Sequence, residues 1–175
     1  DVSGGIYNSK GLDLVAAKNW LNEHRSFEGF PGGDKLSNKE LLELKVDILI
    51  PAALSNQITK ENADKVKCRI LAEGANGPTT IEANEILNEK GVFTIPDILA
   101  NSGGVIVSYF EWVQGMQSFF WSEKDVNNKL WDIISNAFSR VYDFHQAKKV
   151  DMRLSAFAVS IEHLSKAMLY RGFFP

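Results

Sequence analysis

Three turns in this sequence combine small residues with side chains that could hold a flat, polar ligand. They occupy residues 51–53, 73–80 and 96–104, and each follows a short apolar run. Small residues allow the backbone to approach a ligand closely. Asn76 and Asn101, in the second and third turns, each carry a carboxamide that can donate and accept hydrogen bonds. Such side chains suit the recognition of another carboxamide.

Each of these features also has a purely structural interpretation. Glycines after strands often form tight turns and do nothing else, and Asn101 could be a helix N-cap. Glu73 could pair locally with Arg69 or with a lysine. Three small-residue turns, two of them with an asparagine, are more than turn formation requires. Their convergence favours a binding site.

Signals for other chemistries are weak or missing in the sequence. It contains no G-x-G-x-x-G and no Walker A loop, so the usual phosphate-binding patterns are absent. His24, His145 and His163 lie far apart on predicted helices, so we expect no metal site. Ser108 and Ser160 have no G-x-S-x-G context, which leaves a hydrolase nucleophile unsupported.

The composition argues against two classes of partner. Nineteen basic and 22 acidic residues give a formal net charge of −3, whereas nucleic-acid binding needs clustered Lys and Arg. No apolar run approaches the roughly 18–20 residues of a membrane span. Cys68 is the single cysteine, which permits no internal disulfide and fits a reducing cytosol. We therefore expect a cytoplasmic protein that binds neither nucleic acid nor membrane.

The three turns require strands before them and helices between them. The apolar runs predict strands at 46–50, 68–72 and 92–95. Two helices are predicted between them, one at 59–67 and one that begins at a capping box of Thr79 and Glu82 and ends at residue 90. Alternating helices and short apolar strands indicate parallel β-α-β units. Ligands bind at the carboxyl ends of such strands. All three turns should therefore lie on one edge of the sheet.

The two ends of the chain differ from this central region. Residues 1–10 look turn-like, a helix is predicted at 12–24, and Ser37 with Glu40 predicts a short capped helix. After residue 97 the patterns predict only helices. One begins at Asn101 or Ser102 and runs to about residue 120, the next follows a cap of Ser122 and Asp125, and the last covers about 153–170.

Several long motifs are similar to those of the glutamate dehydrogenase family. They are DILIPAALSNQIT at 47–59, ILAEGANGPTT at 70–80, IPDILANSGGVIVSYFEWVQ at 95–114 and, more briefly, GGIYNSKGLD at 4–13 and RGFFP at 171–175. The resemblance covers nearly the whole chain and corresponds to the C-terminal part of the hexameric bacterial and archaeal enzymes. It implies an α/β fold: a partial Rossmann-like domain with a parallel sheet of about three strands, followed by C-terminal helices. We assign 1–98 to a truncated dinucleotide-binding core and 99–175 to a helical region of the same domain.

The resemblance also implies which residues meet the cofactor. Asp1 matches the acidic residue that closes a strand beside the adenosine ribose, which favours NAD over NADP, although NADP remains possible. Ala52 and Ala53 match the turn that passes the cofactor backbone. Asn76 and Asn101 match positions near the nicotinamide and its ribose.

The implied reaction is oxidative deamination of L-glutamate to 2-oxoglutarate and ammonia, with hydride transfer to the nicotinamide. Val105 and Ser108 match the substrate pocket, where Ser108 would meet the side-chain carboxylate. The family implies a homo-oligomer.

The family's glycine-rich fingerprint and its proton-transferring lysine and aspartate have no counterpart in these 175 residues. We therefore expect no catalytic residue here, and we expect this chain alone to be inactive. The alternatives are a branched-chain or aromatic amino acid dehydrogenase of the same superfamily and a non-catalytic binding or assembly module.

Overall fold

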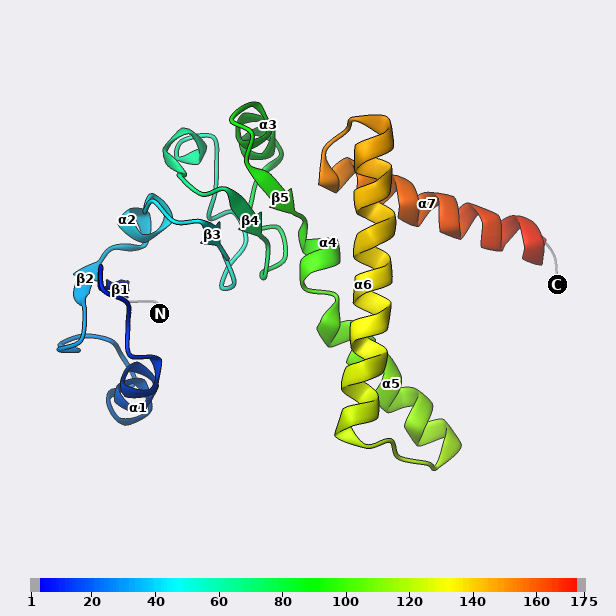
Figure 1. Cartoon of the computed structure of the whole chain (residues 1–175), viewed down its shortest axis with the longest axis horizontal. Coiled ribbons are helices and arrows are strands. Elements are labelled where there is room, and N and C mark those ends of the chain that lie inside the picture. The colour runs from blue at the N-terminus through cyan, green and yellow to red at the C-terminus, as the bar shows by residue number, and fades with distance from the viewer. Residues whose placement is uncertain (1–3, 173–175) are drawn as a thin grey trace.

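The computed structural model describes residues 4–172, so Asp1 lies outside the described residues. A small N-terminal region precedes a three-stranded sheet, and long helices follow it (Figure 1). This is the mixed α/β architecture that the sequence predicts. The predicted division at residue 98 falls inside a short helix, Asp97–Ala100, and stays a prediction.

The sheet is parallel, with strands in the order β3 (Ile48–Leu49), β4 (Ile70–Ala72) and β5 (Phe93–Ile95). Ile48 pairs with Ile70, and Ile70 pairs with Phe93. Leu71, on the central strand, is fully buried. It belongs to a core cluster with Ile58, Ala63, Val66, Cys68, Ala83, Leu87 and Val92. The apolar runs that predicted the strands therefore form this core, although each strand is shorter than expected.

The predicted helix at 59–67 is wrong, because only a single 3-10 turn forms at Ala63–Lys65. The side chain of Asn62 accepts a hydrogen bond from the amide of Thr59 at 2.8 Å and donates one to the carbonyl of Gln57 at 2.9 Å. Such local side-chain bonds compete with helix formation. Lys90 then caps the turn by donating to the carbonyls of Ala63 and Val66.

The N-terminal region contains an antiparallel pair of strands, β1 (Gly5–Tyr7) and β2 (Asp34–Leu36). We expected turns at β1, and the sequence predicted no element at β2. Between the two strands lies α1 (Leu14–His24), close to its predicted span. Next comes α2 (Asn38–Leu42), and the predicted capping box of Ser37 and Glu40 is present. Three-residue strands without regular alternation give too little pattern to be recognised in sequence.

Both ends of the helix that follows β4 lie within one residue of their predicted positions. The helix α3 (Ile81–Glu89) begins one residue later than predicted, with Thr80 as the N-cap in place of Thr79. Gly91, which follows the C-cap Lys90, has a φ of 74°, the left-handed conformation in which glycine ends a helix, so the helix ends within one residue of the predicted position.

The C-terminal region contains α4 (Asp97–Ala100), α5 (Gly103–Gln117), α6 (Glu123–Lys148) and α7 (Met152–Arg171). Asn101 ends α4, so its predicted role as an N-cap is wrong. Ser102, the other predicted cap, is the N-cap residue of α5, but its side chain makes no capping hydrogen bond and its hydroxyl donates to the carbonyl of Leu99 at 2.9 Å. A second core cluster of Leu99, Val141, Met152 and Ala156 joins α4, α6 and α7 to β5. In Figure 1, α6 crosses both α5 and α7. Within residues 4–172, no helix has the length and apolar character that crossing a bilayer requires.

The capping box of α6 is expected to contribute to stability in a pH-dependent way. Ser122 accepts from the amide of Asp125, and its hydrogen bonds to the Asp125 carboxylate lower the pKa of that group. Ser122→Ala is expected to lower the free energy of unfolding by about 1 kcal/mol at neutral pH. A carboxyl with a lowered folded-state pKa stabilises above its unfolded pKa and loses this effect as the pH falls through the folded value. The difference in Tm from wild type should therefore shrink in acid, whereas Ser139→Ala on the same helix should show no loss at any pH.

Candidate functional site

A cleft of about 580 Å³ opens at the carboxyl ends of β4 and β5. Two of the three predicted turns and the first turn of α5 form its walls. The lining residues are Gly74, Asn76, Ile98, Asn101, Ser102 and Val105. The structure therefore brings together residues as far apart in the sequence as Gly74 and Val105, which are separated by 31 positions. They meet at the edge of the sheet where ligands bind to parallel strands.

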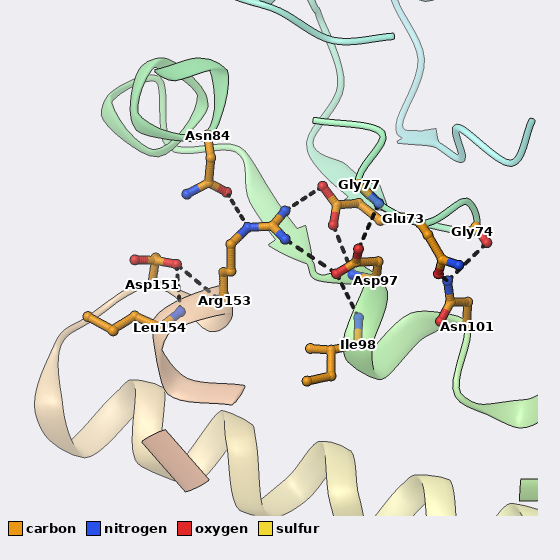
Figure 2. Close-up of polar contacts among 11 residues, drawn as sticks. Glu73, Gly74, Gly77, Asn84, Asp97, Ile98, Asn101, Asp151, Arg153 and Leu154 are labelled. Atoms are coloured by element: carbon orange, nitrogen blue, oxygen red, sulfur yellow. Dashed lines mark hydrogen bonds and ion pairs between the residues drawn. The ribbon is translucent and has the colours of Figure 1, made fainter. Parts of the chain in front are cut away.

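The two asparagines meet in this cleft. Figure 2 shows Asn101 beside Gly74. The Nδ2 of Asn101 donates to the Oδ1 of Asn76 at 2.6 Å and to the carbonyl of Gly74 at 3.4 Å. Within residues 4–172, the Nδ2 of Asn76 and the Oδ1 of Asn101 make no hydrogen bond to the protein. One donor and one acceptor therefore remain for a ligand, and this is the complement of a carboxamide.

The first predicted turn lies against the second. The amide of Ala75 donates to the carbonyl of Pro51 at 2.9 Å. A Cβ built on Gly74 would lie 3.0 Å from the Cβ of Ala52, so the two turns approach closely only because residue 74 is glycine. Ala53 is exposed and does not line the cleft. The cofactor contacts predicted for Ala52 and Ala53 stay predictions.

The two predicted substrate residues lie on α5. Val105 lines the cleft and is 70% exposed, which makes its side chain available to a ligand. Ser108 follows one helical turn later, is exposed, and does not line the cleft. Any contact between Ser108 and a ligand bound at Val105 would extend the site along this helix. Both assignments stay predictions.

The structure contains a cluster of charged residues near the cleft that no sequence pattern indicated. Arg153, on α7, pairs with Glu73 at 2.5 Å and with Asp97 at 3.4 Å (Figure 2). The expected local pairing of Glu73 with Arg69 or a lysine is therefore wrong. The partner lies 80 residues away in the sequence, so no local spacing could reveal it.

Other reactive groups lie away from the cleft. Cys68 is buried in the first core cluster, and burial raises the pKa of its thiol, which keeps it unreactive. In the part of the chain that the structure describes, no three His, Cys, Asp or Glu side chains are grouped as metal ligands. The chemistry of the cleft is that of amides, a hydroxyl and apolar side chains, which fits binding of an organic cofactor.

Comparison with known families decides the class of protein. The Glutamate/Leucine/Phenylalanine/Valine dehydrogenase family matches residues 1–172. The chain belongs to this family. Its motif-based resemblance to glutamate dehydrogenase is thereby confirmed, together with the α/β fold that the resemblance implies.

Individual members of the dehydrogenase family are close relatives. A glutamate dehydrogenase from Thermotoga maritima is 47% identical over 175 residues, which are 100% of this chain and 42% of that protein. An NAD-specific glutamate dehydrogenase from Staphylococcus aureus (strain COL) is 46% identical, over 98% of this chain and 41% of its own length. The chain thus spans about two fifths of these relatives.

A solved structure supports the family assignment. The hetero-hexameric glutamate dehydrogenase from Thermus thermophilus, in its leucine-bound form, superposes with a TM-score of 0.82 at 28% identity. The match covers 98% of this chain and 40% of that one. The sheet and the helices therefore follow an established dehydrogenase fold.

Proposed function

We propose that this chain is the cofactor-binding part of an NAD-dependent glutamate dehydrogenase, which converts L-glutamate to 2-oxoglutarate and ammonia. The observation that carries the proposal is the Asn76–Asn101 pair, which presents a free donor and a free acceptor at the carboxyl edge of the sheet. The close relatives named as glutamate dehydrogenases support the reaction, and the NAD-specific relative supports the cofactor.

In this proposal the residues of the chain bind and orient, and they transfer no proton. When bound, NAD would supply the chemistry by accepting hydride at its nicotinamide. Asn76 and Asn101 would hydrogen-bond the carboxamide or ribose of the nicotinamide half, while Gly74 and Ala52 leave room for the cofactor backbone. Asp1 would contact the adenosine ribose and disfavour a 2′-phosphate, so NADP is the weaker candidate.

The substrate would lie beyond the nicotinamide, toward α5. Val105 would contact the aliphatic part of glutamate, and the Ser108 hydroxyl would donate to its side-chain carboxylate. An apolar substrate would gain nothing from a hydroxyl at Ser108. Greater activity on leucine than on glutamate would therefore overturn this assignment in favour of a branched-chain amino acid dehydrogenase.

The same proposal places the enzyme in the cytoplasm as a homo-oligomer. Large apolar side chains on α5 and α7 are exposed in the single chain, including Trp112 at 60% and Leu164 at 61%. Exposed apolar side chains at this density are typical of surfaces that are covered in an assembly. The hetero-hexameric relative from Thermus thermophilus supports an oligomeric assembly.

The proposal is tested in the full-length protein that carries this chain. Wild type is expected to form NADH in a glutamate-dependent reaction. Asn101→Ala is expected to raise the KM for NAD about tenfold, because the substitution removes one hydrogen bond to the cofactor and also the bond that orients Asn76. Asn128→Ala, which removes an exposed amide from α6, is the matched control and should leave the KM unchanged. Absence of glutamate-dependent NADH formation, or an unchanged KM in Asn101→Ala, would contradict the proposal.

A further inference from the structure

Arg153 is placed to control the shape of the cleft without touching a ligand in it. Its guanidinium contacts three acceptors on three other parts of the chain: Glu73 at 2.5 Å, Asp97 at 3.4 Å and the Oδ1 of Asn84 at 3.4 Å. Arg153 itself does not line the cleft. Figure 2 shows it between α3, the turn after β4 and the start of α4.

The hydrogen bonds continue from Arg153 to the backbone beside both asparagines. Glu73 accepts from the amide of Asp97 at 2.8 Å, and Asp97 accepts from the amide of Gly77 at 2.8 Å. Gly77 directly follows Asn76, and the four residues of α4 begin at Asp97 and lead into Asn101. This network therefore helps to set the relative position of the two asparagines, together with the direct hydrogen bond between them.

Because this network is buried, its geometry depends on the positive charge of Arg153. The Glu73 side chain is fully buried, and the side chains of Arg153 and Asp97 are 19% and 22% exposed. A buried carboxylate without its partner is strongly unfavourable, so Glu73 would rearrange if Arg153 were lost. Its bond to the Asp97 amide would then break, and the start of α4 would shift.

We propose that Arg153 is a positioning residue that sets the cofactor affinity of the cleft by fixing the turn at Gly77 and the start of α4. This inference rests on the proposed function. A guanidinium is required because its rigid fork reaches three acceptors at once, whereas an ammonium group acts as a single point charge. Arg153 also lies in the first turn of α7, so the position of that helix is coupled to cofactor binding.

The test measures NADH affinity of the full-length protein by fluorescence titration, alongside thermal unfolding. Arg153→Lys keeps the charge and is expected to raise the Kd for NADH at least tenfold. The double variant Glu73→Gln with Arg153→Met removes both charges together, so it should unfold at a higher temperature than Arg153→Met alone and still bind at least tenfold more weakly than wild type. A residue with only a structural role would lower Tm and leave the Kd of the folded protein unchanged.

Lys166→Met is the matched control, because Lys166 is a cation on the same helix whose pair with Glu162 at 2.6 Å is exposed. Its Kd should equal that of wild type. A folded Arg153→Lys or double variant with wild-type Kd overturns the positioning role and leaves the proposed function intact. Failure of the wild-type protein to bind NADH would instead refute the proposed function, and this inference with it.

Discussion

Leu71→Ala is expected to lower the free energy of unfolding by about 2–5 kcal/mol. Leu71 lies on the central strand β4 and is fully buried within the first core cluster, so its removal leaves a cavity between the sheet and α3. A typical domain is stable by only about 5–15 kcal/mol, so the loss removes a large share of the total. Denaturant unfolding, followed by far-UV circular dichroism, measures the change.

Ile81→Ala is the control for this prediction. It removes a branched side chain that is 77% exposed at the start of α3, and it should change the unfolding midpoint little. Equal losses for Leu71→Ala and Ile81→Ala would mean that burial on β4 is not what holds the sheet together.

Gly74→Val is expected to weaken NADH binding by at least tenfold in the full-length protein. The new Cβ would meet the Cβ of Ala52 at 3.0 Å and the Cγ2 of Ile50 at 3.5 Å. The branched methyl groups of valine extend further, so the turns after β3 and β4 must separate and the cleft wall must move. Fluorescence titration with NADH measures the effect.

Gly115→Val provides the same substitution where space is available. Apart from its chain neighbours and the backbone of its own helix, no atom of the described chain lies within 4 Å of a Cβ built at Gly115, which is on α5 beyond the cleft-lining residues. Its Kd for NADH should match that of wild type. If Gly74→Val also retained the wild-type Kd, the close approach of the two turns would have no role in binding.

The parallel sheet could be predicted from sequence because its signals are local and repeated. Short apolar runs ending in small-residue turns predicted β3, β4 and β5, and the rule that parallel strands present their carboxyl ends together predicted that Asn76 and Asn101 would lie near each other. The capping boxes that begin at Ser37 and Ser122 could also be predicted, because each is a local pattern of four residues. The family resemblance added the expectation of a nicotinamide cofactor, which no local pattern contains.

The sequence by itself thus determined the fold class, the edge of the sheet that carries the site and the two carboxamides in it. Only the tertiary structure decided the partner of Glu73 and the separate helix α4. The pairing with Arg153 joins residues 80 positions apart, and it exists because α7 packs beside β5 and brings a cation to a buried carboxylate. Such pairing depends on how elements pack, and neither the spacing nor the type of neighbouring residues encodes it.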